Sequence, residues 1–428
     1  KFASAIASDD GVFFTPKSLV KMIVNIIEPT QGIVLDPACG SGGMFVSSSD
    51  FVNSEGINAN SAMTFYGQEK VEFNAKLCIM NMAVHGLNAK IKSGDEANSF
   101  YHDAHNLEGS CDYVMANPPF NVDKVKAEST QNAGRLPFGL PGVNQKKEVS
   151  NANYLWISYF YAYLNDTGRA GFVMAASATD SGNKDREIRK QLIQTGHVDC
   201  LMSVANNFFY KVSLPCSLWF FDKGKKEELK DKVLFIDSRN YYTVVDRTLN
   251  EWSEWQMKNL NAIVWLYRGE KEKYTKLLQD YRTQIINDCR ELDAAFESVS
   301  ILLNGYGEKL KPLRVQISDI VKKSDDINQL LPLNDLLKKY TTELNASLKT
   351  LFEYGDGLEK DEAKVFAKSI DESATTWDRF KKSVSASLEE VVSQIKDCRT
   401  VIKEAKWLTE KFGDGTYTDV LGLCKVAT

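Results

Sequence analysis

The stretch Asp112-Tyr113-Val114-Met115-Ala116-Asn117-Pro118-Pro119-Phe120 decides the fold. Its first five residues predict a buried strand, and the two prolines end that strand because proline has no N–H to donate to a sheet. A carboxamide, a stiffened backbone carbonyl and an aromatic ring therefore meet at the carboxyl end of the strand. A planar amino group needs acceptors for two N–H donors and a surface to stack on, and these groups offer both. An ordinary strand-ending turn is the alternative.

A glycine-rich loop lies upstream of this stretch. Residues 33–36 predict a β-branched strand that runs into Pro37-Ala38-Cys39-Gly40-Ser41-Gly42-Gly43, and a helix opens near Met44. Glycines at these positions permit a tight turn and let a ligand approach the backbone. A phosphate-binding loop would continue with Lys-Ser/Thr, which is absent, so a ligand without phosphate fits better. Cys39 has no evident base partner and is interpreted as a small packing residue of this loop.

Acidic residues close three predicted strands in succession. Asp36 ends the first strand, Glu69 ends the strand 63–69, and Asp95 ends a strand that begins near Ile91. Open α/β sheets bind ligands at this edge, where a carboxylate can accept hydrogen bonds from ribose hydroxyls. Each acid alone would suit a solvated charge or a helix cap. The series, followed by the Asn-Pro-Pro-Phe strand end, indicates a ligand site.

The alternation of strand and helix continues after the tetrad. Apolar helices are predicted over 154–164 and 185–195, and strands over 169–174, 197–204 and 217–221. This order predicts an α/β fold with a doubly wound, mostly parallel sheet. Between the tetrad and the first of these helices, residues 121–151 are polar and carry five basic residues, Lys124, Lys126, Arg135, Lys146 and Lys147. They are expected to form a mobile loop that orders on nucleic acid, or else a solvated insertion.

From about residue 252 the pattern changes to helix. Apolar residues at alternating three- and four-residue steps form two amphipathic or coiled-coil stripes. They are Tyr274, Leu278, Tyr281, Ile285, Leu292, Ala295, Val299 and Leu302, with Asp288 as a polar interruption, and Phe380, Val384, Leu388, Val391, Ile395, Cys398 and Ile402. Breaks are expected at 325–326 and 355–357. Helices this long must pair with each other or with a partner. The predicted domains are 1–251, catalytic, and 252–428, helical and partner-docking.

Composition sets broad limits. The chain has 428 residues and a net charge of -5, which is unpromising for a protein that binds DNA alone. Eight cysteines without CxxC pairing suit reduced thiols in the cytoplasm and argue against a zinc site. No apolar run is long enough for a transmembrane span. Because residue 1 is Lys, the chain is expected to be a fragment or a processed form.

The motifs together resemble those of S-adenosylmethionine-dependent adenine-N6 DNA methyltransferases, and most closely the methylation (modification) subunit of type I restriction-modification systems. The resemblance covers residues 11 to about 222. It rests on Phe13-Phe14-Thr15-Pro16, Asp36 with the glycine-rich loop, Glu69, Asp95 and Asn117-Pro118-Pro119-Phe120.

The resemblance implies a role for each motif. The cofactor S-adenosylmethionine would be bound by Phe13, Phe14, Thr15, Pro16, Asp36, Cys39, Gly40, Ser41, Gly42, Gly43, Glu69 and Asp95. Catalysis would fall to Asn117, Pro118, Pro119 and Phe120, after the target base has flipped out of the duplex. Phe120 and Phe209 would stack on that base, with Phe208 as an alternative to Phe209. A specificity subunit would dock on the C-terminal helices, and a second methylation subunit and a restriction subunit would complete the complex.

Two other functions stay open from the sequence. Glutamine-N5 methyltransferases of proteins and some RNA methyltransferases use a similar Asn-Pro-Pro-aromatic pattern, because a side-chain amide is also planar with an NH2 group. The chain could instead be an assembly scaffold whose methyltransferase half has lost activity. Cofactor binding and a substrate assay distinguish these cases.

Overall fold

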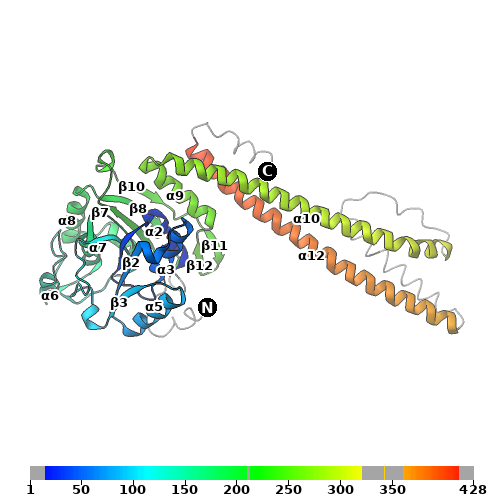
Figure 1. Cartoon of the computed structure of the whole chain (residues 1–428), viewed down its shortest axis with the longest axis horizontal. Helices are drawn as coiled ribbons and strands as arrows, with labels where there is room; N and C mark the ends of the chain where they lie inside the picture. The colour runs from blue at the N-terminus through cyan, green and yellow to red at the C-terminus, as the bar shows by residue number, and fades with distance from the viewer. Residues whose placement is uncertain (1–14, 210–212, 321–341, 343–359, 414–428) are drawn as a thin grey trace. The chain divides into compact units, whose positions relative to one another are not determined.

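The computed structural model describes residues 15–209, 213–320, 342 and 360–413. The chain forms two compact units that divide between Leu277 and Leu278. The first unit carries an α/β fold and the second carries long helices (Figure 1).

The main strands of the first unit are β1 (Gly32–Asp36), β2 (Met63–Glu69), β3 (Ala89–Ser93), β4 (Cys111–Ala116), β7 (Leu164–Ala175), β8 (Val198–Val204), β9 (Cys216–Asp222) and β10 (Leu234–Asp237). Its helices are α2 (Lys17–Ile27), α3 (Gly43–Ser54), α4 (Ala59–Ala62), α5 (Glu72–Val84), α6 (Ala127–Asn132), α7 (Asn153–Tyr163), α8 (Asn183–Gln194) and α9 (Glu254–Arg268). Short pieces are η1 (Asp95–Ala97), η2 (Ala176–Thr179), η3 (Glu227–Leu229), β5 (Val125–Lys126), β6 (Glu148–Val149), β11 (Thr243–Asp246) and β12 (Leu249–Glu251).

The main strands form one eight-stranded sheet in the order β10-β8-β9-β7-β4-β1-β2-β3. Strand β9 runs antiparallel to β7 and β8, and the other neighbouring strands pair in parallel. The carboxyl ends of β1, β2, β3 and β4 therefore meet at one edge of the sheet. The predicted doubly wound, mostly parallel α/β fold is confirmed.

Both faces of the sheet are buried. Along β4, Met115 joins the core beneath α2, α3 and α9, whereas Val114 and Ala116 join the core beneath α7 and α8. Strand β9 alternates in the same way. A strand that is covered on both faces has a continuous run of apolar residues. For this reason the sequence 112–116 correctly predicted a core strand.

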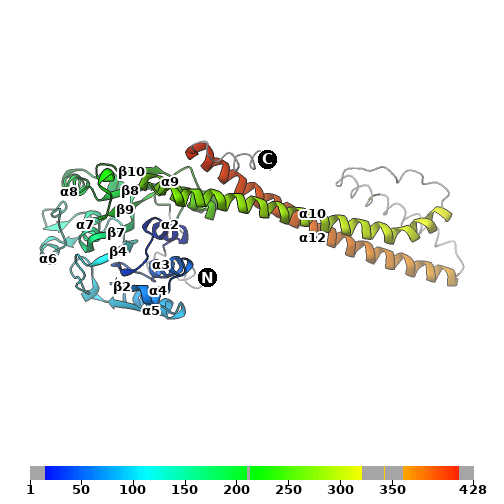
Figure 2. The same ribbon diagram turned by 45° about the horizontal axis from the view of Figure 1, so that its top comes forward.

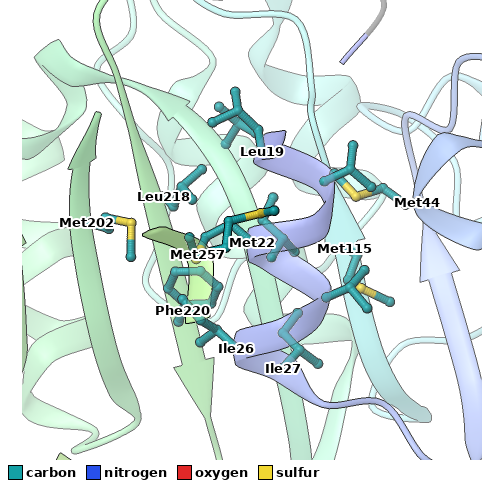
Figure 3. Close-up of a cluster of buried hydrophobic side chains, with 14 of the residues drawn as sticks. Leu19, Met22, Ile26, Ile27, Met44, Met115, Met202, Leu218, Phe220 and Met257 are labelled. Atoms are coloured by element: carbon teal, nitrogen blue, oxygen red, sulfur yellow. The ribbon is translucent and has the colours of Figure 1, made fainter. Parts of the chain in front are cut away.

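Helix α2 is fixed against the sheet by close packing. Its residues Leu19, Met22, Ile26 and Ile27 lie against Met115 and the strands near Phe220 (Figure 3). Gly171 of β7 makes this approach possible, because a Cβ there would lie 2.6 Å from Ile27 Cδ1 and 3.0 Å from Ile23 Cγ2. The residue at the start of α2 is consequently held in a defined place above the sheet.

Two expectations need correction. Strand β3 ends at Ser93, so Asp95 lies in the following 3₁₀ turn η1 rather than at the strand end. Residues 121–151 are not an irregular loop, since β5 and β6 pair as a small antiparallel sheet beside α6. The predicted breaks at 325–326 and 355–357 lie outside the described residues.

The second unit is built on α10 (Lys271–Ile320), which begins in the first unit, and α12 (Lys360–Phe412). The two helices run side by side in both views (Figures 1 and 2). The buried residues of the stripes are Tyr274, Leu278, Tyr281, Ile285 and Val299 of α10 and Val384, Val391, Cys398 and Ile402 of α12. The long helices predicted from the stripes are confirmed, and much of their apolar surface is covered within the chain. Across the described residues, none of the helices has the length and apolarity to cross a membrane.

Candidate active site at the carboxyl edge of the sheet

The tetrad leaves the sheet directly after β4. Asn117 is half-buried, Pro118 is buried and Pro119 is exposed. The Asn117 carboxamide donates from Nδ2 to Thr15 Oγ1 over 3.0 Å. Its other end, Oδ1, is buried and has no hydrogen-bond partner among the residues that the structure describes. A buried acceptor left unpaired is costly, so this atom is suited to a donor that arrives with a ligand.

Two phenylalanines meet beside the tetrad. The rings of Phe120 and Phe209 lie edge to face, with centroids 6.2 Å apart and planes at 90°. Phe208 instead packs at 4.6 Å on Trp252 and is fully buried. Of the two candidates for the second stacking ring, Phe209 is thus the one that contacts Phe120, and both side chains are buried in the same hydrophobic core.

The glycine-rich loop turns back on β2. Asp36 Oδ1 accepts from the Ala38 N–H over 3.0 Å, and the Cys39 N–H donates to the Gln68 carbonyl over 3.0 Å. Gly42 caps α3 with φ of 78°, a left-handed conformation that favours glycine. Cys39 is buried, and a Cβ at Gly67 would lie 2.9 Å from its Sγ. Cys39 therefore packs against the strand, as its interpretation as a packing residue predicted.

Glu69 ties the ends of the strands together. One carboxylate oxygen accepts from the Gly40 N–H over 3.0 Å and the other from the Val71 N–H over 2.8 Å. Each oxygen keeps a second lone pair for a ligand hydroxyl. Asp95 is exposed on η1, and the Gly94 N–H before it donates to the Glu69 carbonyl over 3.2 Å. Asp36 and Glu69 thus end adjacent strands, and Asp95 lies in the turn that follows the next strand.

Burial perturbs the first of these acids. The pKa of Asp36 is raised from 3.8 to about 8, mainly because the side chain is buried, with a smaller contribution from the negative charge of Glu69 and an opposing one from the Ala38 N–H. A buried carboxylate next to another acid favours a cationic ligand, which would restore its charge. The sulfonium and ammonium groups of S-adenosylmethionine are cations of this kind.

A pH dependence of stability follows from this shift. Between about pH 4 and pH 8 the unfolded chain releases the Asp36 proton while the folded chain keeps it, so the free energy of unfolding falls as pH rises through this window. Asp36→Asn is expected to flatten that slope in urea unfolding measured across the window. The control Asp246→Asn should leave the slope unchanged, because Thr248 holds the pKa of Asp246 below its usual range. An unaltered slope in Asp36→Asn would show that Asp36 is ionised in the folded chain.

Sequence reasoning missed two buried polar residues that shape the edge. Gln68 is fully buried, and its Nε2 donates to Ser99 Oγ over 3.0 Å and to the His102 carbonyl over 3.1 Å. Arg135, counted above among the basic residues of an exposed loop, is buried, with its guanidinium 4.5 Å from the Tyr159 ring. Only the polar character of these residues was visible in the sequence, and nothing there distinguished them from surface residues.

The predicted site residues are therefore largely brought together. Thr15 and Pro16 precede α2, and Thr15 is hydrogen-bonded to Asn117, whereas Phe13 and Phe14 lie outside the described residues. The Asp36 loop and Glu69 are joined by hydrogen bonds, and Phe120 contacts Phe209. Lys124, Lys126, Lys146 and Lys147 are exposed on and beside the β5–β6 pair, which follows the tetrad in the chain.

A doubly wound sheet with a glycine-rich first loop, an acid closing the second strand and Asn-Pro-Pro-Phe after β4 defines the class of S-adenosylmethionine-dependent methyltransferases that act on amino groups. Comparison with known families agrees, since the N-6 DNA Methylase family matches residues 1–285. The chain belongs to this family.

Its relatives are methylase subunits. The chain is 39% identical over 264 residues to the type I restriction enzyme MjaIX methylase subunit of Methanocaldococcus jannaschii, covering 61% of this chain and 46% of that protein. It is 34% identical over 254 residues to the HindI methylase subunit of Haemophilus influenzae, covering 59% and 55%. The chain spans about half the length of these curated relatives.

A solved structure shares the fold. The methyltransferase subunit of the type I restriction-modification system from Streptococcus thermophilus superimposes with a TM-score of 0.54 at 21% identity, covering 61% of this chain and 55% of that one.

Proposed function

We propose that this chain transfers a methyl group from S-adenosylmethionine to adenine N6 in duplex DNA, as the modification subunit of a type I restriction-modification complex. The unpaired, buried Oδ1 of Asn117 at the carboxyl end of β4 carries the proposal. An exocyclic amine is a planar donor that would satisfy this oxygen, and adenine presents one on its Watson–Crick edge.

The chain's own groups would position the amine. Asn117 Oδ1 and the Pro118 carbonyl accept its two N–H groups, which directs the nitrogen lone pair out of the plane of the base. Phe120 would stack on one face of the base. Phe209, whose ring now contacts Phe120 edge to face, would contact the base once the two rings separate. Because Oδ1 is covered in this structure, a neighbouring group has to move before the base can reach it. No general base is needed if positioning and polarisation carry the step.

The residues present fit the cofactor. Gly40 leaves room for a ligand, since nothing lies within 4 Å of a Cβ built there, whereas Gly42 packs closely against Cys78 and Met82. Asp36 favours a cation, and Glu69 and Asp95 offer carboxylate oxygens to ribose hydroxyls. Thr15 and Pro16, with Phe13 and Phe14 before them, and Cys39, Ser41 and Gly43 of the loop complete the proposed binding set. When bound, the cofactor supplies the electrophilic methyl group on its sulfonium.

A substrate assay tests the proposal. The full chain, purified with its co-encoded neighbours, is incubated with methyl-labelled S-adenosylmethionine and duplex DNA, RNA or a glutamine peptide. We expect label in N6-methyladenine at defined sites of the DNA alone. Label in RNA or in the peptide would assign the chain to another substrate class, and cofactor binding without any transfer would support the scaffold alternative.

We further propose that residues 278–428 dock a separate specificity subunit and that a second methylation subunit and a restriction subunit join the complex. The relatives are subunits by name, and Ile301 and Val392 are 61% and 66% exposed on the long helices. An acidic chain with little counterion release of its own would also gain DNA affinity from a partner.

Truncation separates the two roles. A chain that ends at Leu277 is expected to keep its affinity for S-adenosylmethionine within about threefold, because the cofactor residues lie in the first unit. It should no longer co-purify with the specificity subunit. A cut after Trp252, which removes α9, is a poorer test because Arg268 of that helix pairs with the buried Asp199. Retained complex formation by the Leu277 truncation would place docking in the first unit.

A further inference from the structure

The one polar contact that the structure gives the Asn117 side chain comes from Thr15. Nδ2 donates to the Thr15 hydroxyl, and Oδ1 is left unpaired in the part of the chain that the structure describes. We propose that Thr15 is a positioning residue for the reaction, which holds the Asn117 carboxamide by its nitrogen end so that its oxygen end faces the incoming amine. This inference rests on the proposed function. It gives Thr15 a second role, since so far Thr15 has been assigned only to the cofactor site.

Thr15 is itself held rigidly. It immediately precedes Pro16, and the residue before a proline is restricted to extended backbone. Pro16 caps α2 with φ of -57°, and α2 is packed on the sheet through Leu19, Met22 and Ile26 (Figure 3). The same core includes Met115, two residues before Asn117. The Thr15 hydroxyl and the Asn117 carboxamide therefore lie at the ends of two elements, α2 and β4, that pack directly against each other.

The chemistry of the target explains why the carboxamide needs such an anchor. The terminal torsion of asparagine is soft and roughly two-fold, so an unanchored carboxamide can present either its oxygen or its NH2 group. An amine that offers N–H donors needs the oxygen. A hydroxyl can accept as well as donate, and by accepting from Nδ2 it leaves Oδ1 to accept an N–H of the amine. The reverse arrangement would set the Asn117 NH2 against the amine's own N–H groups.

The anchor should act on the rate more than on binding. Thr15→Val keeps the shape of the side chain and removes the hydroxyl, whereas Thr15→Ser keeps the hydroxyl. With Val, we expect the single-turnover rate at saturating cofactor and DNA to fall by about 10- to 100-fold, because the acceptor is misoriented for part of the time. Because the cofactor is saturating, a change in the Kd for S-adenosylmethionine does not alter this rate, and Thr15→Ser should restore most of it.

The experiment uses the full chain in the complex that methylates DNA. Thr167→Val, which removes an exposed hydroxyl at the opposite edge of the sheet, serves as the matched control. Thermal unfolding of each variant checks that α2 is still docked. If Thr15→Val unfolds, Thr15→Ala and Thr15→Ser provide the same comparison of a side chain without and with a hydroxyl.

Asn117→Asp gives an independent readout. A carboxylate accepts through both oxygens, so the Thr15 hydroxyl would donate to one and leave the other for the amine. The residual rate of Asn117→Asp should then fall further when Thr15→Val is added.

The outcomes separate this inference from the function on which it rests. A weaker cofactor Kd with an unchanged saturated rate in Thr15→Val would make Thr15 a cofactor-binding residue only and would overturn the positioning role. An unchanged rate and Kd would overturn it as well. If the wild-type complex methylates an amine other than adenine N6, the proposed function fails, while the same Val and Ser comparison on that substrate still tests Thr15.

Discussion

Replacing Asn117 with alanine is expected to abolish methyl transfer and to leave the affinity for S-adenosylmethionine within a few-fold. Asn117 Oδ1 is the acceptor that we propose for the amine, and Asn117 is absent from the hydrogen bonds that join the glycine-rich loop to Glu69. Its contribution is therefore made mainly in the transition state. Loss of one positioned group of this kind typically costs about 100- to 1,000-fold in rate, and more where lone-pair direction also depends on it.

The measurement is a single-turnover methylation assay with calorimetric titration of the cofactor. Asn117→Asp is the matched variant, and we expect partial activity because an acceptor oxygen survives. Wild-type activity in Asn117→Ala would rule out the mechanism. Loss of cofactor binding in the same variant would instead assign Asn117 to the cofactor site.

Breaking the ion pair between Arg268 and Asp199 is expected to cause the largest loss of stability. Arg268 donates to Asp199 Oδ2 through Nη2 over 2.7 Å and through Nε over 3.2 Å, and to the Ile26 carbonyl over 2.8 Å. The two side chains are only 7% and 1% exposed. Asp199→Ala leaves a buried guanidinium without its counter-charge, which typically costs about 3 to 5 kcal/mol in the free energy of unfolding.

An exposed pair in the same unit provides the control. Arg239 and Asp237 make an equally short contact of 2.7 Å, but their side chains are 65% and 55% exposed. Asp237→Ala should therefore change the free energy of unfolding by no more than about 1 kcal/mol. Urea unfolding of both variants makes the comparison. Similar small effects would mean that water reaches Arg268 once Asp199 is gone.

The sequence was sufficient for the fold because the strands that build the sheet are buried on both faces. Apolar runs such as 112–116 and 217–221 ended in prolines or polar residues, and they became β4 and β9 almost to the residue. The antiparallel direction of β9 could not be predicted, because a run of apolar residues does not indicate whether its strand pairs in parallel or antiparallel. Helix α2 was not predicted, because its residues directly follow the Phe-Phe-Thr-Pro motif and were not assigned to an element. Helix α9 lies within the region that was predicted to be helical from about residue 252.

The sequence predicted the motifs that make up the site better than it predicted the contacts between them. The tetrad, the glycine-rich loop and Glu69 each carried a local signal, and the order of strands brought their ends to one edge. The bond from Asn117 to Thr15 links residues 102 positions apart, and no local pattern encodes such a pairing. Arg135 shows the opposite error, because a basic residue in a polar segment resembles a surface residue until its aromatic neighbours are known.

That separation of 102 positions has a consequence for the nascent chain. Residues near the beginning of the described chain cannot complete the catalytic edge until β4 has been synthesised and α2 has docked on it. Closing so long a segment is slow compared with forming local helices, so the carboxamide is anchored late in folding. A chain that has formed its secondary structure but not this contact would contain the tetrad with the Asn117 carboxamide not yet hydrogen-bonded to Thr15. Under the proposed function, a half-folded chain would therefore methylate DNA poorly, and activity would report on a fully assembled domain.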